Sequence, residues 1–101
     1  MSEQITVIAK FKTKPEAREK LIEIVLKLVR LTREESGCLN YDFHCDLEDP
    51  TVFYMHENWR DAAALENHFK QPYIHEAFTA AADVLTEPVE IKRLQMISPE
   101  L

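Results

Sequence analysis

Apolar and polar side chains alternate along several segments of the chain and recur at helical spacing in the stretches between them. The alternating segments predict four strands: residues 4–12, 38–46, 51–59 and 89–97. Apolar residues return every three or four positions over residues 16–35, and again over residues 61–69 and 72–85, as they do along one face of a helix. The pattern therefore predicts the order strand, helix, strand, strand, helix, strand.

Turn and capping residues fall at the ends of these segments. Pro15 suits the first turn of the first helix, where its missing N–H costs little, and Gly37 stands where that helix is expected to stop. Residues 47–50 predict a turn that joins the second and third strands in an antiparallel hairpin. Asp61 is expected to cap the next helix, and Pro72 to restart or kink it.

This order of elements is that of the ferredoxin-like βαββαβ fold, an α+β arrangement with a four-stranded antiparallel sheet and its helices on one face. We expect a single domain over residues 1–101, because a second core would be too small to be stable. The other face of the sheet would expose a set of apolar side chains: Ile8, Val52, Tyr54, Leu94 and Met96. A homodimer that packs sheet on sheet is the simplest way to cover them.

Composition and charge exclude several classes of protein. No segment is long and apolar enough to span a membrane, and the first residues lack the pattern of a signal peptide. The net charge of −6, with basic residues scattered among acidic ones, is unfavourable for nucleic-acid binding. Cys38 and Cys45 are an odd number of residues apart, which would place them on opposite faces of one strand. We therefore expect two free thiols in a reducing cytoplasm.

Candidate chemistry gathers on the helix-facing side of the third strand. Glu57 and Trp59 share a face with Phe53 and Met55, and a carboxylate among core residues is costly unless it is paired or solvated. His68 falls on the inward stripe of the second helical region, so it could meet Glu57 in a cleft between sheet and helices. A carboxylate beside an imidazole fixes its tautomer and raises its basicity. A structural pair that anchors the helix explains the same pattern equally well.

Aromatic side chains are expected to line the same space: Tyr41, Phe43, Trp59, Phe69 and Phe78. A cavity with aromatic walls and a few polar groups is suited to a flat organic ligand, although a plain aromatic core is the more common origin of such a set. The four histidines do not have the spacing of a zinc site, so we expect no metal. The chain also has no glycine-rich phosphate loop and no dinucleotide-binding fingerprint.

Three stretches, ESGCLNYDFH, FYMHENW and ALENHFKQPYIHEAF, resemble the antibiotic biosynthesis monooxygenase domain family. The family pattern is Glu-x-Gly-Cys-x-x-Tyr, then Glu-x-Trp, then Leu-x-x-His with a proline a few residues later. The matching positions of this chain are Gly37, Cys38, Tyr41, Glu57, Trp59, Leu65, His68, Pro72 and Tyr73. The opening and closing strands also fit, so the resemblance covers nearly the whole chain.

The resemblance implies a dimeric α+β barrel that oxygenates a small quinol or polyketide-like aromatic with O2, without flavin, haem or metal. In this interpretation His68 is the base and Glu57 orients it. Substrate contacts would come from Asn40, Tyr41, Phe43, Trp59, Phe69, Tyr73 and Phe78. The family is functionally mixed, and two alternatives remain. One is an isomerase or degrading enzyme for a small phosphorylated quorum-sensing signal, for which Lys92 or Arg93 could bind the phosphate. The other is a non-catalytic dimer that binds a small molecule.

Overall fold

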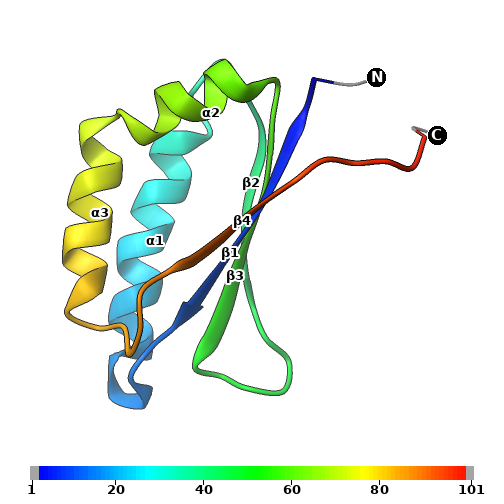
Figure 1. Ribbon diagram of the computed structural model, residues 1–101. Coiled ribbons are helices and arrows are strands. Elements are labelled where there is room, and N and C mark those ends of the chain that lie inside the picture. The colour runs from blue at the N-terminus through cyan, green and yellow to red at the C-terminus, as the bar shows by residue number, and fades with distance from the viewer. Residues whose placement is uncertain (1–2, 100–101) are drawn as a thin grey trace.

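The structure, a computed structural model, describes residues 3–99, and its elements follow the predicted order (Figure 1). The elements are β1 (Ile5–Lys12), the 3₁₀ turn η1 (Pro15–Ala17), α1 (Arg18–Thr32), β2 (Cys38–Cys45), β3 (Val52–Trp59), α2 (Ala62–Phe69), α3 (Pro72–Ala82) and β4 (Glu90–Leu94). The first two and last two residues of the predicted domain lie outside the described residues.

The four strands form one antiparallel sheet in the order β2-β3-β1-β4. The three α-helices of residues 3–99 all lie on one side of this sheet, and none of them covers the other side (Figure 1). The hairpin of β2 and β3 pairs as the turn residues predicted. The α+β ferredoxin-like fold is therefore confirmed, and it creates a closed layer between sheet and helices.

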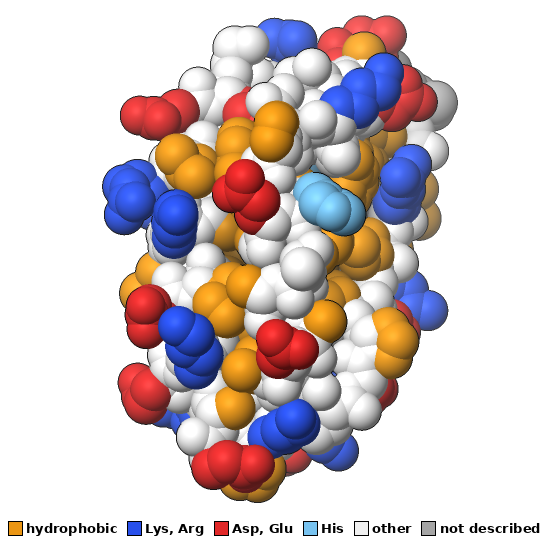
Figure 2. Space-filling model, turned by 90° about the vertical axis from the view of Figure 1, so that its left-hand side faces the viewer, with side chains coloured by type: hydrophobic (Ala, Val, Ile, Leu, Met, Phe, Trp, Pro, Cys, Tyr) orange, Lys and Arg blue, Asp and Glu red, His pale blue; other side chains and the backbone are white. Residues whose placement is uncertain are grey.

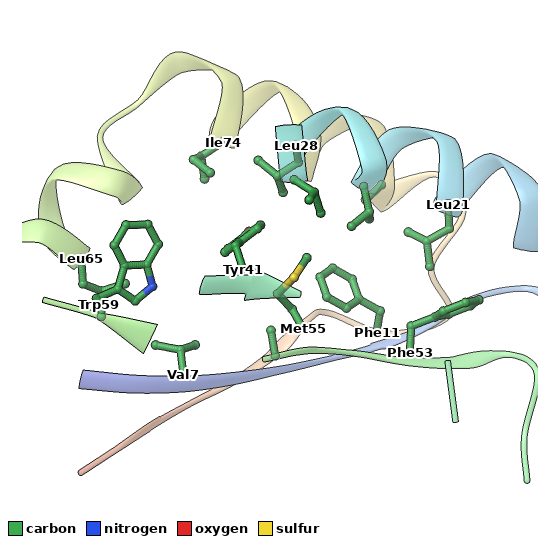
Figure 3. Close-up of a cluster of buried hydrophobic side chains, with 14 of the residues drawn as sticks. Val7, Phe11, Leu21, Leu28, Tyr41, Phe53, Met55, Trp59, Leu65 and Ile74 are labelled. Carbon is green, nitrogen blue, oxygen red and sulfur yellow. The ribbon is translucent and has the colours of Figure 1, made fainter. Parts of the chain in front are cut away.

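That layer is filled by the inward faces that the alternation predicts (Figure 3). Val7, Ala9 and Phe11 of β1 are buried, as are Phe53 and Met55 of β3. The stripe of α1 that covers them consists of Leu21, Val25, Leu28, Val29 and Thr32. Removing each large apolar side chain from water contributes about 1.5–3 kcal/mol, so this cluster is the main source of stability.

Gly37 does not end the first helix, which corrects the sequence-based prediction. Helix α1 ends at Thr32, and Gly37 does not have the positive φ of a helix-terminating glycine. The glycine is needed because the chain passes very close to α2. A Cβ atom at this position would lie 2.3 Å from the Cβ of Ala64.

A bulge in β2 changes which side chains face the helices. Cys38 pairs with Trp59 while Asn40 pairs with Asn58, so Leu39 is an extra residue in the ladder and is 56% exposed. Cys38 and Cys45 therefore both lie on the helix side of the sheet, and the prediction of opposite faces is wrong. Both cysteines are free thiols, as predicted.

The second helical region and the last strand are shorter than predicted. Helix α3 ends at Ala82, which is exposed, and Leu85 instead forms an isolated bridge with Thr13. Strand β4 ends at Leu94. Val52, expected on the uncovered face, is buried within the single chain.

Candidate active site

A cluster of buried polar side chains lies at the end of the layer covered by α2. Glu57 and Trp59 come from the end of β3, and His68 comes from α2. Their exposed fractions are 4%, 0% and 2%. The backbone N–H of Ala64 donates to the Asp61 carboxylate over 2.8 Å, which fixes the start of α2. The helix then turns Leu65 and His68, three residues apart, into the layer.

The carboxylate that holds His68 is Glu35, from the loop after α1. His68 Nδ1 lies 2.7 Å from Glu35 Oε2, and the Tyr73 hydroxyl donates to the same oxygen. Burial lowers the pKa of His68 and the nearby Glu35 opposes this effect only partly, so the imidazole is neutral at pH 7. A neutral ring that donates from Nδ1 has its lone pair on Nε2. Within residues 3–99, Nε2 has no hydrogen-bond partner.

Within residues 3–99, Glu57 and His68 form no hydrogen bond with each other, so the expected Glu57–His68 pair is wrong. Trp59 Nε1 donates to Glu57 Oε1 over 2.9 Å, and the indole ring packs against the imidazole with 4.4 Å between their centroids. Trp59 therefore contacts both acid–base groups. Glu35 was not predicted as a site residue because the helical pattern of the sequence continues to that position. Its only signal was the first position of the Glu-x-Gly-Cys motif.

Several groups in this cluster have displaced pKa values. Burial raises the pKa of Glu57 to about 7, with a further contribution from Glu35 and an opposing one from the Trp59 hydrogen bond. Burial also raises the pKa of Tyr41 and Tyr73, which therefore stay neutral phenols. The pKa of the Cys38 thiol rises to about 11, again mainly through burial, so this thiol is a poor nucleophile. The cluster thus contains a neutral base and a carboxyl group that exchanges its proton near neutral pH.

The structure brings some of the predicted aromatic residues to His68. The ring of Tyr41 lies edge-on to His68 at 5.5 Å and to Trp59 at 6.3 Å between centroids. Phe69 lies 5.4 Å from the imidazole. Phe43 stacks on Phe53 in the apolar part of the layer and does not join the cluster.

Asn40 lies on the uncovered face of the sheet. Asn58 Nδ2 donates to Asn40 Oδ1 over 2.8 Å, and Asn40 Nδ2 donates to Asp42 over 3.1 Å. The first bond fastens β3 to β2 on the side away from the helices, and the second lies within β2. Asn40 therefore does not belong to the same site as His68.

Two hollows open along the edge strand β4. One, of about 380 Å³, has Ile5, Leu65 and Arg93 among its lining residues. The other, of about 530 Å³, is lined by Phe78 and Ile91 together with residues of the connection between α3 and β4. These volumes are in the range of small-molecule sites.

Arg93 connects the first hollow to the cluster. It pairs with Val7, which faces the helices, and its guanidinium lies 5.7 Å above the Phe69 ring, which in turn contacts His68. Lys92 points to the opposite face and pairs with Glu90 at 3.5 Å. Of the two predicted phosphate-binding candidates, Arg93 is therefore the one near the site.

Tyr73 also borders a surface groove of about 570 Å³ between α1 and α3. Figure 2 shows this helical face, with apolar side chains between charged ones. Residues 3–99 contain no group of three or more His, Cys, Asp or Glu side chains arranged to hold a metal ion. No helix among them has the length and apolar character needed to cross a bilayer.

Comparison with known proteins identifies, over most of the chain, the same family that the motifs resemble. A family model described as "Antibiotic biosynthesis monooxygenase" matches residues 4–80. The protein sll1783 of Synechocystis sp. is 38% identical over 88 residues, which are 87% of this chain and 60% of that protein. The chain thus spans less than two thirds of that relative.

Two further relatives match along nearly their whole length. Rv0793 of Mycobacterium tuberculosis, named as a proposed monooxygenase, is 30% identical over 91 residues, 90% of this chain and 89% of that protein. The crystal structure of PA3566 from Pseudomonas aeruginosa has 37% sequence identity and a TM-score of 0.88, and covers 97% of this chain and 98% of that chain.

Proposed function

Because the chain belongs to the antibiotic biosynthesis monooxygenase family, we propose that it oxygenates a small quinol or polyketide-like aromatic with O2, with His68 as the base. The observation that carries this proposal is the state of His68. Its imidazole is buried and neutral, its Nδ1 is bound to a carboxylate, and its Nε2 lone pair has no partner within the described residues.

The proposed reaction needs no external reductant. When Nε2 takes the proton of a phenolic hydroxyl, the O–H bond breaks and its electron pair stays on the substrate oxygen. The resulting anion is electron-rich enough to reduce O2 itself. A phenol plus O2 contains the same atoms and electrons as a quinone plus water. The protein therefore has to remove a proton, hold the anion and exclude bulk water.

Glu57 supplies a second acid–base group. Its pKa of about 7 lies where a proton is both taken up and released at neutral pH. Trp59 holds the carboxylate through Nε1 and packs against His68, so the indole keeps the two groups in a fixed relation. We assign Glu57 the proton transfer that accompanies loss of water from the oxygenated substrate.

The substrate is proposed to bind from the hollows along β4. The Phe69 ring lies 5.7 Å from the Arg93 guanidinium and 5.4 Å from the imidazole, so we propose that a flat substrate ring displaces or stacks on Phe69 to approach His68. We propose Tyr41 and Trp59, whose rings lie against His68, as the inner wall of the site. Phe78 lines the second hollow and would contact the far end of a larger substrate.

Oxygen uptake with a panel of reduced quinols tests this function. His68→Ala should lower uptake by about 10²-fold or more, because general-base catalysis supplies an effect of that size. His75→Ala is the matched control, since His75 is exposed on α3 and should leave uptake unchanged. Uptake by the wild-type protein that is no faster than autoxidation would overturn the proposal, as would full uptake by a folded His68→Ala protein.

Arg93 favours one second candidate, an isomerase or degrading enzyme for a small phosphorylated carbonyl compound. Within residues 3–99 its guanidinium forms no ion pair, and it borders a hollow, as a phosphate-binding side chain would. This candidate predicts conversion of such compounds without oxygen uptake, and its loss in Arg93→Gln. Binding of an aromatic ligand with neither reaction would instead indicate a non-catalytic binding protein.

We also propose that a second copy of the chain covers the helix-free face of the sheet. Leu94, Met96 and Ile97, in and after β4, are 47%, 49% and 96% exposed. Tyr54 and Ile8 add apolar surface on the same face. Sedimentation at micromolar concentration should give the mass of a dimer, and a monomer mass would contradict the proposal.

The free thiols support a cytoplasmic location. Cys38 and Cys45 are unpaired, and reducing compartments keep thiols in this state. The raised pKa of Cys38 also slows its oxidation, since the thiolate is the reactive form. Fractionation of cells that contain the protein would test this placement, and recovery outside the cytoplasm would contradict it.

A further inference from the structure

We propose that Glu35 and Tyr73 are positioning residues for His68: Glu35 Oε2 fixes the imidazole tautomer, and the Tyr73 hydroxyl sets how strongly Glu35 acts on the ring. The inference deepens the proposed function and rests on His68 as its base. It replaces the role expected of Glu57, whose hydrogen-bond partner is Trp59.

Three separate elements converge on one carboxylate oxygen. Glu35 is held in the loop after α1 by backbone bonds from its own N–H to Thr32 and from the N–H of Cys38 to its carbonyl. His68 approaches from α2 and Tyr73 from the first turn of α3. The Glu35 side chain is only 12% exposed, so both bonds form in a medium of low dielectric, where charge effects are strong.

The arrangement supports the transition from imidazole to imidazolium. As Nε2 takes a proton from a substrate hydroxyl, positive charge develops on the ring while Nδ1–H remains on Glu35. A carboxylate 2.7 Å away stabilises that charge and keeps the ring in the tautomer with Nε2 available. The Tyr73 hydroxyl donates to the same oxygen and withdraws some of its charge, which weakens its pull on the ring.

Within the described residues, no Lys or Arg partner explains the burial of Glu35. Among residues 3–99, no Lys or Arg forms an ion pair with it, and its second oxygen, Oε1, is buried without a hydrogen bond. A buried carboxylate oxygen without a hydrogen bond costs free energy, so its retention favours a role beyond anchoring the loop. The charge therefore faces His68.

The other titratable groups around His68 come from every neighbouring element. They are Tyr41 on β2, Glu57 on β3 behind Trp59, Tyr73 on α3 and Arg93 on β4 beyond Phe69. Glu35 is the one in direct hydrogen-bond contact with the ring. Changes at Glu35 and Tyr73 should consequently act on His68 with opposite signs.

Nitrogen-15 NMR of the histidine side chains, without substrate, tests this directly. The wild-type protein should show His68 with a proton on Nδ1 and a free Nε2. Glu35→Gln should lower the pKa of His68 by about 1 or more, because a negative charge in contact is lost. Tyr73→Phe should raise it, because Glu35 then retains its full charge. His75, exposed on α3, is the internal control, and its ring signals at a given pH should be the same in all three proteins.

The acid limb of the pH–rate profile should move to lower pH in Glu35→Gln and to higher pH in Tyr73→Phe. A proton on Nε2 in the wild-type protein, or shifts of the same sign in both variants, would overturn the inference. If Glu35→Gln does not fold, an unchanged or lowered His68 pKa in Tyr73→Phe overturns it alone. The NMR result is independent of turnover. Absence of oxygen uptake would thus refute the proposed function, while the NMR titration would still decide the positioning roles.

Discussion

The layer between sheet and helices has two ends that are built in different ways. The end beneath α1 contains the apolar side chains Leu21, Phe11 and Phe53 (Figure 3). The end beneath α2 buries Glu57 and His68 among aromatic rings. Apolar burial stabilises a fold, whereas burying a carboxyl and an imidazole costs free energy. The difference indicates that the first end supports folding and that the second is retained for chemistry.

Leu21→Ala should have the largest effect, and it should be confined to stability. Leu21 is 0% exposed, and truncation of a buried leucine destabilises a protein by about 2–5 kcal/mol. Urea unfolding should show this loss, while turnover of the folded fraction stays near that of the wild type. An equal fall in turnover under folded conditions would break the separation between the two ends.

Glu57→Gln should instead raise the free energy of unfolding at high pH, because it removes a buried charge. A carboxyl whose pKa is raised from 4.5 to about 7 on folding binds its proton more tightly in the folded state. Its contribution to stability is present below pH 4.5 and is lost as the pH rises through 7. The variant should therefore be more stable than the wild type at pH 8, by about 3 kcal/mol, and no more stable at pH 4. Equal stability of the two proteins at pH 8 would refute the assignment of a buried charge.

Gly37→Ala tests the close packing between α2 and the loop that contains Glu35. The added Cβ would clash with Ala64, whose backbone cannot move easily, so we expect a loss of about 1–3 kcal/mol. The double variant with Ala64→Gly removes the clash and should recover part of the loss. Additive losses in the thermal unfolding of the double variant would argue against direct contact.

Asp61→Ala should have the smallest effect, a modest fall in Tm from loss of the α2 cap. The hydrogen bond from Ala64 lowers the pKa of Asp61, so this contribution is present above the ordinary pKa of aspartate. It is lost as the pH falls through the lowered value. Asp61→Asn keeps an accepting oxygen and should retain most of the stability. A larger effect on turnover than on Tm would show that the cap also sets the position of His68.

The fold was largely predictable because periodicity reports burial directly. Alternation placed Val7 and Met55 inward, and the Asp61 cap set the start of α2 correctly. Gly37 was misjudged because its role depends on a contact with Ala64, 27 positions along the chain, which no local pattern reveals. The bulge at Leu39 could not be predicted either, because the alternation of apolar and polar residues continues through this position in the sequence.

The candidate site was only partly predictable. Burial of Glu57 and His68 followed from their positions on inward faces. The partner of His68 could not be derived, because Glu35 lies in a loop whose path is set by tertiary packing. Asn40 does not join the site because it lies on the opposite face of the sheet from His68. Phe43 does not join it because it stacks on Phe53 in the apolar part of the layer.

The most direct test of the account is to measure stability and oxygen uptake of Glu57→Gln on one preparation at pH 8. If the end beneath α2 is kept for chemistry at a cost in stability, the variant should be more stable than the wild type and slower in turnover. A variant that gains stability and keeps full turnover would contradict the account, because Glu57 would then have no part in the reaction.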